Sequence, residues 1–269
     1  MSAFRRRVAA MTGVAEERLE RLAGGDLSEV LLVRRPDGRQ SVAKASSGVG
    51  TEAAMLRALA NAGVPAPSVE AEHEGVLLLE YVSNDRVFSP LAWADVGTSL
   101  ARLHARTGDD YGWPVDYRIG TVELGNAARA DWPTFWGEQR LLSTAALLDR
   151  PWRERIEALL PRLRALLPER PRPALLHGDL WSGNILVREG ALAAFIDPAC
   201  YHGDAEVDLA MISLFDGSPA AFCDAYGGLD GGWQERRPVY QLFPALLHLR
   251  LFGSGYAGLV DRLLSEIGA

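Results

Sequence analysis

The residues best suited to chemistry begin where an apolar run stops at a polar loop. Asp179 follows His-Gly directly after that run, and Asn184 stands five residues further on. A hairpin formed by residues 185–187 and 192–196 would carry these two residues on its entering loop and Asp197 at its exit. Three oxygen ligands would then meet at one end, and hard cations such as Mg²⁺ prefer oxygen. Any one of them could merely cap a turn, but all three in this frame favour a metal site.

A lone lysine marks a second candidate site. The 28 basic residues include a single lysine, Lys44, and all the others are arginine. An ammonium is compact whereas a guanidinium is a wide planar fork, so a tight site can require lysine. Glu52 lies beside the apolar stripe of the helix expected at 51–61, where a carboxylate needs a cation. The pattern predicts a Lys44–Glu52 ion pair. The alternatives are a lysine that survived compositional drift and a glutamate that faces solvent.

Short strands and one helix would position these groups. Residues 29–33 and 40–44 are typical of two strands joined by a turn at 35–38. Gly24 and Gly25 precede them in a turn whose backbone N–H groups either face phosphate oxygens or simply reverse the chain. Two further strands follow the helix. The order strand, strand, strand, helix, strand, strand predicts an α+β lobe.

From about residue 91 the pattern becomes mainly helical. Apolar residues recur at helical spacing in six segments, which loops bearing Gly and Pro separate. These segments are 91–106, 132–148, 152–167, 207–214, 236–251 and 256–267. The predicted fold class is therefore α+β with two lobes, a small antiparallel sheet with one helix (1–82) and a larger, mainly helical lobe (83–269).

Composition narrows the class of protein. With 269 residues, 48% hydrophobic and 23% charged, the chain can bury a full core, which excludes disorder. A net charge of −7 argues against nucleic acid or an anionic membrane as the main partner. Two cysteines are too few for a disulfide framework. The first residues favour an amphipathic helix over a signal peptide, and no segment approaches the ~20 apolar residues of a membrane span. We expect a cytoplasmic protein.

Residues 177–197 resemble the catalytic loop of protein kinases, which has His-Arg-Asp, an Asn five residues after that Asp, and a metal-binding Asp one hairpin later. Here glycine replaces the arginine and Asp-Pro replaces Asp-Phe-Gly, as in small-molecule kinases of the aminoglycoside phosphotransferase and choline kinase group. Within that group the fructosamine (ketosamine) kinases are the most similar, through His-Gly-Asp-Leu-Trp-Ser-Gly-Asn at 177–184 and the segment 197–211. Other positions that look familial are Gly24, Gly25, Lys44, Glu52 and the middle run 119–141.

The resemblance implies a protein-kinase-like fold and phosphoryl transfer from ATP with Mg²⁺. Asp179 would accept the proton of the acceptor hydroxyl, while Asn184 and Asp197 would hold Mg²⁺. His177 and Asp208 would support the loop. The residues implied to bind the nucleotide are Gly24, Gly25, Lys44, Glu52 and, at a strand end between the lobes, Glu80, Tyr81 and Val82.

The acceptor side is assigned to residues that flank the catalytic loop. Trp181 either packs on the carbon skeleton of an open-chain sugar amine or fills the core. Asp204 either meets the substrate's ammonium or caps the following helix. Tyr201 and His202 complete the set. The family more often has Tyr-Tyr or Tyr-Phe at these last two positions, and glutamine where this chain has Leu124, so the exact substrate stays open.

The resemblance implies a kinase for the 3-hydroxyl of ketosamines, which are sugar adducts on amines, free or protein-bound. Phosphorylation there is an early step of deglycation. Two alternatives are a phosphotransferase for an aminoglycoside, choline or another amino-alcohol, and a nucleotide-binding module without turnover. The intact set of catalytic residue types disfavours the module. Which sugar is preferred, and the oligomeric state, are left open.

Overall fold

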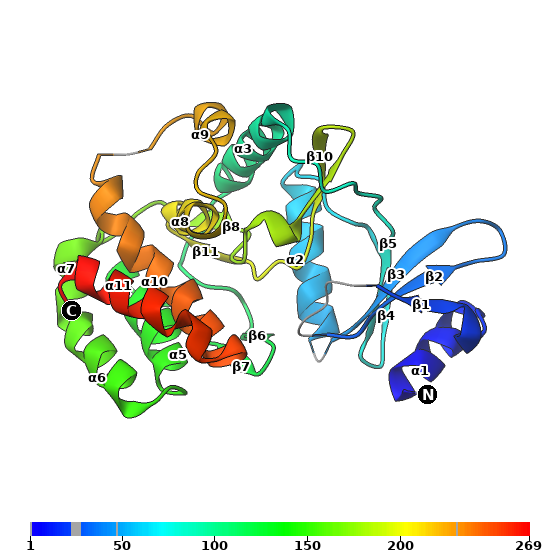
Figure 1. Ribbon diagram of the computed structural model, residues 1–269, viewed down its shortest axis with the longest axis horizontal. Coiled ribbons are helices and arrows are strands. Elements are labelled where there is room, and N and C mark those ends of the chain that lie inside the picture. The colour runs from blue at the N-terminus through cyan, green and yellow to red at the C-terminus, as the bar shows by residue number, and fades with distance from the viewer. Residues whose placement is uncertain (1, 23–27, 47, 230) are drawn as a thin grey trace.

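The structure, a computed structural model, describes residues 2–22, 28–46, 48–229 and 231–269. Its small lobe is built on a five-stranded antiparallel sheet in the order β1-β2-β3-β5-β4 (Figure 1). The strands are β1 (Leu19–Arg21), β2 (Val30–Arg34), β3 (Gln40–Ala45), β4 (Val69–His73) and β5 (Val76–Glu80). The expected order of strands around one helix is confirmed, and so is the pairing of the first predicted hairpin, in which Val30 lies opposite Lys44.

Two helices cover the sheet, one on each face. Helix α1 (Ala3–Thr12) packs Phe4 and Val8 against strand residues such as Leu31. It is the amphipathic first helix that the sequence predicts. Because α1 packs on this sheet, the small lobe has two helices, whereas one was expected. Helix α2 (Val49–Asn61) covers the opposite face.

Helix α2 is buried on two sides because it lies between the lobes. Ala53 and Leu56 pack against the sheet, whereas Met55 and Leu59 belong to the core of the helical lobe. The first turn of the helix contains Glu52, which is only 1% exposed. A carboxylate is thus held at the junction of the two lobes.

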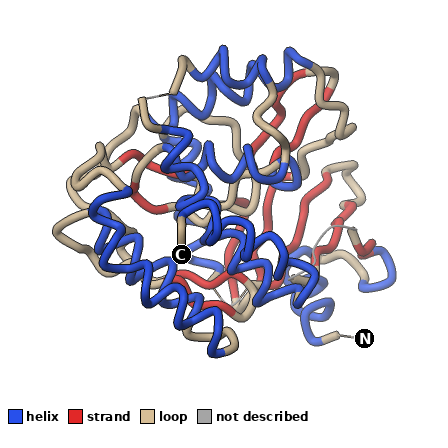
Figure 2. The backbone as a smooth tube through the Cα atoms, turned by 60° about the vertical axis from the view of Figure 1, so that its left-hand side comes forward, coloured by secondary structure: helices blue, strands red, loops and turns tan. Residues whose placement is uncertain are grey.

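The larger lobe combines helices with short two-stranded sheets, and Figure 2 shows how helices dominate it. Its principal helices are α3 (Pro90–His104), α4 (Trp132–Phe135), α5 (Ser143–Ala145), α6 (Arg150–Leu159), α7 (Leu163–Leu166), α8 (Glu206–Phe215), α9 (Ala220–Tyr226), α10 (Trp233–Phe252) and α11 (Ala257–Ile267). Its strands are β6 (Tyr117–Ile119), β7 (Val122–Leu124), β8 (Ala174–Leu176), β9 (Ile185–Arg188), β10 (Ala191–Phe195) and β11 (Tyr201–Gly203). All six predicted helical segments contain helix.

Three local features differ from the sequence prediction. The segment predicted as one helix over 132–148 is divided, because a π-helical stretch (Trp136–Leu142) separates α4 from α5. The β6–β7 hairpin and helix α9 were not predicted. Strand β11 pairs with β8 although 24 residues separate the two strands in sequence, a pairing that local periodicity does not reveal.

A buried arginine organises the core near the π-helical stretch. Arg140 is 1% exposed, and its guanidinium carbon lies 3.9 Å from the centre of the Tyr201 ring and 4.9 Å from that of Phe135. It donates hydrogen bonds to the Gly125 carbonyl (2.6 Å) and to Asn126 Oδ1 (2.8 Å). This arginine therefore fixes the loop that follows β7.

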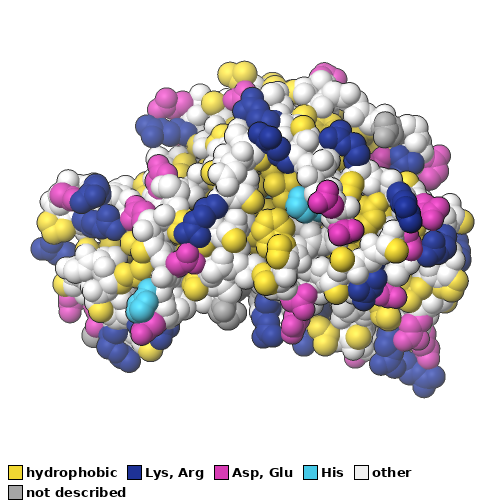
Figure 3. Space-filling model, turned by 180° about the vertical axis from the view of Figure 1, so that it is seen from behind, with side chains coloured by type: hydrophobic (Ala, Val, Ile, Leu, Met, Phe, Trp, Pro, Cys, Tyr) yellow, Lys and Arg dark blue, Asp and Glu magenta, His cyan; other side chains and the backbone are white. Residues whose placement is uncertain are grey.

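Charged side chains of both signs are interspersed with hydrophobic ones on the face that Figure 3 shows. Most of the ion pairs found in the structure are surface contacts of this kind, and such pairs contribute little to stability. In the part of the chain that is described, no helix has the length and apolar character needed to cross a bilayer. The two ion pairs of Lys44 differ from these, because they hold an ammonium that is 13% exposed between the lobes.

Candidate functional site

Lys44 lies on the central strand of the sheet and contacts two carboxylates. Its Nζ is 2.7 Å from Glu52 Oε1 on α2 and 2.8 Å from Asp197 Oδ1 in the other lobe. The predicted ion pair with Glu52 is confirmed, and the alternative of a solvent-facing glutamate is wrong. The second contact links positions 153 residues apart. The ammonium thus joins the two lobes.

Electrostatics keep this ammonium charged. Burial disfavours the charged form, but the carboxylates of Asp197 and Glu52 outweigh it, and the pKa of Lys44 lies above its ordinary value. Burial also raises the pKa of Glu52, although Lys44 opposes that rise. The lysine therefore presents a permanent positive charge in a space from which most water is excluded, where charges interact strongly.

Helix α8 holds the loop of residues 177–184, which is predicted to be the catalytic loop. Asp208, in the first turn of α8, accepts hydrogen bonds from the backbone N–H groups of His177 (2.8 Å) and Gly178 (2.9 Å). Asp216, which follows the last turn, accepts one from the N–H of Ser182 (2.9 Å). Because α8 anchors the loop on both sides of Asp179, that carboxylate has a fixed position.

The His-Gly pair shapes the loop. Gly178 has φ +81°, and a β-carbon there would lie 2.1 Å from the carbonyl oxygen of Ala199, so only glycine fits. The buried His177 ring donates from Nε2 to the Ile196 carbonyl (3.0 Å) and accepts at Nδ1 from the N–H of Asp179 (3.3 Å). Burial lowers the pKa of His177, so its ring stays neutral. These contacts agree with a supporting role.

Asp179 and Asn184 meet across the loop. The Nδ2 group of Asn184 donates to Asp179 Oδ2 (2.9 Å) and to the Asp179 carbonyl (2.7 Å). The surrounding protein shields the Asp179 carboxyl from water and raises its pKa to about 7, although the hydrogen bond from Asn184 opposes the rise. A carboxylate with a pKa near neutrality is suited to accept a proton.

Asp197 completes the constellation at the far end of the β9–β10 hairpin. Ile185 pairs with Phe195, and the N–H of Ile196 donates to the Asn184 carbonyl (3.0 Å), so Asn184 and Asp197 flank the same end, as predicted. Asp197 has φ +53°, a conformation uncommon outside glycine that is often retained at functional positions. Lys44, Asp179, Asn184 and Asp197 are therefore brought together.

The donor set at this end suits a hard divalent cation. Asn184 uses its amide nitrogen for Asp179, and the Asp197 carboxylate is 43% exposed. Within the described residues, no group of three His, Cys, Asp or Glu side chains is arranged to hold a metal. Mg²⁺ is commonly bound by one or two carboxylates together with substrate phosphates. The residues present fit that mode, in which the nucleotide supplies further oxygens.

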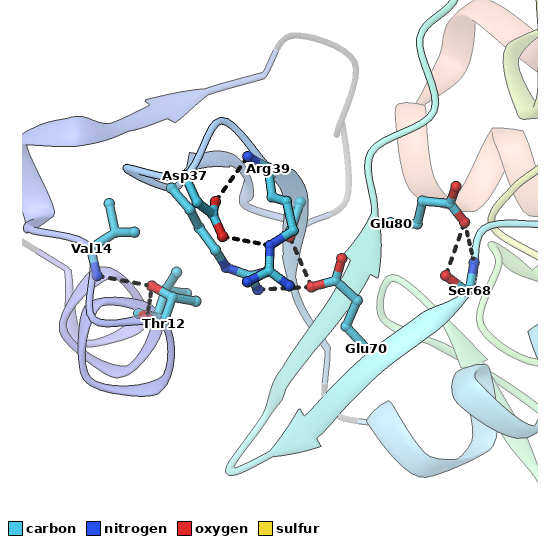
Figure 4. A network of polar contacts seen from close by, with 10 residues as sticks. Thr12, Val14, Asp37, Arg39, Ser68, Glu70 and Glu80 are labelled. Atoms are coloured by element: carbon cyan, nitrogen blue, oxygen red, sulfur yellow. Dashed lines mark hydrogen bonds and ion pairs between the residues drawn. The ribbon is translucent and has the colours of Figure 1, made fainter.

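The structure gives no direct support for the other residues that are predicted to bind the nucleotide. Gly24 and Gly25 lie outside the described residues. Glu80 ends β5, and its carboxylate accepts hydrogen bonds from Ser68 Oγ (2.9 Å) and the Ser68 N–H (3.2 Å), as Figure 4 shows. The Glu80 side chain is therefore bonded to Ser68, the residue that precedes β4. Adenine recognition by Glu80, Tyr81 and Val82 through backbone groups stays a prediction.

Two residues predicted to contact the acceptor are corrected. Tyr201 is 1% exposed because Arg140 and Phe135 cover its ring. Asp204 is buried, accepting hydrogen bonds from Tyr240 Oη (2.6 Å) and the N–H of Glu206 (3.1 Å). Its carboxylate caps α8 and fixes α10, which is the alternative role. Neither side chain is free to receive a substrate beside Asp179.

The other two acceptor predictions are partly exposed. His202 is half-buried, its ring stacks on Trp113 at 6.2 Å between centres, and burial lowers its pKa. Among the described residues, no hydrogen bond or ring contact joins His202 to the loop of residues 177–184, so its role stays a prediction. Trp181 lies within the loop and is half-buried, so its side chain neither fills the core nor is fully exposed.

An aromatic cluster that the sequence analysis did not predict extends from Trp181. The Trp181 ring lies 5.9 Å from that of Phe215, which lies 4.8 Å from His248. His248 is in turn 5.3 Å from Phe252 and 5.0 Å from Tyr256. The spacing of four residues between His248 and Phe252 was a signal for part of this cluster, because it places both rings on one face of α10, whereas Tyr256 lies beyond the end of that helix. Phe252 is 44% exposed, so the cluster reaches the surface.

Comparisons with known proteins agree along the whole chain. A model of the fructosamine kinase family matches residues 4–268. A probable ketoamine kinase of Thermus thermophilus is 36% identical over 252 residues, which are 91% of this chain and 92% of that protein. One of Synechocystis is 37% identical over 212 residues, which are 76% of this chain and 72% of that protein.

Solved structures agree with these relatives. A crystal structure from Thermobifida fusca that carries the name fructosamine-3-kinase aligns with a TM-score of 0.85 and 31% identity over 98% of both chains. An amicoumacin kinase in complex with AMP-PNP and Ca²⁺ aligns with a TM-score of 0.68 and 17% identity, over 97% of this chain and 91% of that one. This second likeness concerns the fold alone.

Proposed function

The chain belongs to the fructosamine kinase family, and on that premise we propose that it transfers the γ-phosphoryl group of ATP to the 3-hydroxyl of a ketosamine. The bond between the β,γ-bridging oxygen and the γ-phosphorus breaks, the acceptor oxygen forms a bond to that phosphorus, and ADP leaves. The acceptor hydroxyl loses its proton. Its product would be a ketosamine 3-phosphate.

The contact between Lys44 and Asp197 is the observation that carries the proposal. An ammonium from the small lobe lies 2.8 Å from a carboxylate that follows the β9–β10 hairpin, and Glu52 holds the same ammonium at 2.7 Å. Phosphoryl transfer depends mainly on alignment and on neutralising charge on the phosphate oxygens. A fixed cation opposite oxygen ligands meets both needs.

Each residue then has a distinct task. Lys44, held by Glu52, neutralises phosphate oxygens of the nucleotide. Asn184 and Asp197 are the residues that would hold Mg²⁺, which when bound offsets negative charge on the phosphates. Asp179 orients the acceptor hydroxyl and takes its proton, because its carboxylate is fixed by Asn184 at 2.9 Å.

The aromatic cluster is proposed as the acceptor wall. A ketosamine has an open-chain carbon skeleton with an amine that is protonated at neutral pH, and aromatic faces attract such cations at about 0.5–2 kcal/mol. Trp181 follows Asp179 by two residues, so its ring is near the reacting hydroxyl. From there the rings of Phe215 and His248 continue toward the surface, where Phe252 is 44% exposed.

An acceptor panel tests the proposal. Purified protein with Mg²⁺ and ATP is incubated with lysine adducts of erythrulose, ribulose and fructose, free and in a peptide, and with kanamycin and choline. ADP release and the mass of the product are measured. We expect phosphate on at least one ketosamine, at a rate well above that with either amino-alcohol. Transfer to kanamycin or choline but to no ketosamine would contradict the proposal, and so would the absence of any transfer.

The raised pKa of Asp179 predicts the pH dependence. A proton acceptor must be ionised, and because its pKa is about 7, the active form is lost as pH falls below 7. We expect kcat/KM for the acceptor to fall roughly tenfold per pH unit there and to level off above. Nucleotide affinity measured over the same pH range is the control. A flat profile between pH 5 and 8 would count against Asp179 as the base.

A further inference from the structure

Tyr117 lies on the β6–β7 hairpin of the helical lobe but reaches the small lobe. Figure 1 shows this hairpin beside the lobe junction. The Tyr117 ring is 3.8 Å from the position that a β-carbon on Gly48 would take. Gly48 caps the N-terminus of α2, the helix whose first turn contains Glu52. The ring therefore packs across the junction at the level of the Lys44–Glu52 pair.

The charged groups at the junction act electrostatically on the phenol of Tyr117. Burial and the carboxylates of Glu52, Asp197 and Asp179 raise its pKa, and Lys44 opposes the rise. Such effects require short distances in a poorly hydrated space. Tyr117 is half-buried, and its ring lies against the N-cap of α2, the helix that contains Glu52.

The hairpin is anchored, so the ring is held in place. Asp116 Oδ1 accepts a hydrogen bond from the N–H of Asn126 (2.7 Å), which closes the base of the hairpin. Arg140 in turn holds the Gly125 carbonyl and Asn126 Oδ1 from within the core. Tyr117 also packs against the main hydrophobic core of the helical lobe. The position of the Tyr117 ring is therefore fixed by hydrogen bonds and packing within the helical lobe.

Water can compete with the acceptor hydroxyl for the γ-phosphoryl group. An aspartate that accepts a proton from an alcohol can also accept one from water, in which case a water oxygen bonds to the γ-phosphorus and ADP and phosphate leave. Enzymes limit this side reaction by excluding water from the site. We propose that Tyr117 is a specificity-determining residue that shields the phosphate site from water at the lobe junction, an inference that rests on the proposed phosphotransferase function.

The test is the ratio of ATP hydrolysis to phosphoryl transfer. ADP release without acceptor and formation of phosphorylated ketosamine are measured for Tyr117→Ala and Tyr117→Phe. Arg118→Ala is the matched control, because Arg118 is exposed on the same hairpin and pairs with Glu123, which is also exposed. We expect the ratio to rise on the order of tenfold for Tyr117→Ala and to stay near the wild-type value for the other two. A purely structural role would lower both rates together, and that unchanged ratio would overturn the proposal.

Hydrogen–deuterium exchange gives a readout that needs no turnover. The backbone N–H of Glu52 donates to the carbonyl of Gly48 (3.0 Å), the residue against which the Tyr117 ring packs. We expect Tyr117→Ala to accelerate exchange several-fold in the peptide that contains the first turn of α2, while Tyr117→Phe and Arg118→Ala leave it unchanged. Equal exchange in all variants would contradict the shielding role. If the wild-type protein phosphorylates no ketosamine, the proposed function fails, yet this exchange still decides the role of Tyr117.

Discussion

Replacing Asp179 by asparagine is expected to lower the rate of phosphoryl transfer by about three orders of magnitude while ATP still binds. Asparagine has nearly the same shape but cannot accept the proton of the acceptor hydroxyl, and loss of a general base typically costs 10²–10⁴-fold. The amide oxygen of the new side chain can still accept the hydrogen bond that Asn184 Nδ2 donates at 2.9 Å. We therefore expect the loop to stay folded. Steady-state ADP release gives the rate, and titration calorimetry gives the affinity for ATP.

Asp216→Asn is a matched control for this experiment. It makes the same chemical change on a carboxylate that also holds the catalytic loop, through the Ser182 N–H at 2.9 Å, but away from the reacting groups. Its turnover should stay within a few-fold of wild type. If Asp179→Asn keeps more than roughly a tenth of wild-type turnover, well outside the range for a lost base, Asp179 is not the base and the mechanism must be reassigned.

The catalytic half of the site could be predicted because its residues are close in sequence. Asn184 and Asp197 flank a hairpin of two short apolar runs, and strand pairing of neighbours in sequence is the most local form of tertiary structure. The Lys44–Glu52 pair spans only eight residues on a strand and the helix that follows it. In both cases the chain between the two residues is short, so few relative positions of their side chains are possible.

The errors on the acceptor side arise from long-range packing. Tyr201 and His202 alternate across β11, and the sequence does not show which of them faces the core, because the partner strand β8 is 24 residues away. Tyr201 is the one that faces the core, because the guanidinium of Arg140 lies over the face of its ring. Asp204 likewise accepts a hydrogen bond from a distant residue, Tyr240, which lies 36 residues further along the chain.

Some features left a usable signal and others did not. The aromatic pair at 248 and 252 was visible at helical spacing, but nothing local adds Tyr256, which lies beyond the end of α10. The lobe boundary near residue 82 stays a prediction, although β5 ends at Glu80 and α3 begins at Pro90. Nothing local places Tyr117 beside α2, because the contact joins two lobes that pack only in the finished fold.

Replacing Lys44 by arginine is expected to lower kcat/KM for ATP by about 10²–10³-fold, the usual cost of removing a charged donor from a transition state. A tetrahedral ammonium contacts Glu52 Oε1 at 2.7 Å and Asp197 Oδ1 at 2.8 Å, and Glu52 is 1% exposed. A guanidinium is wider and planar, so it cannot occupy that point without moving α2 or the chain at Asp197. Stopped-time ADP assays at varied ATP give the parameter, and thermal melting shows whether the variant is folded.

The same experiment decides why this chain has one lysine. If Lys44 merely survived a drift toward arginine, Lys44→Arg would be neutral, as exchanges at exposed positions are expected to be. Arg57→Lys is the matched control, because Arg57 is exposed, lies on the same helix as Glu52 and pairs with Glu72 at the surface, where ion pairs contribute little. We expect that control to retain full activity. Wild-type kinetics in Lys44→Arg would mean that the site needs only a positive charge, and the steric explanation for the lone ammonium would then be wrong.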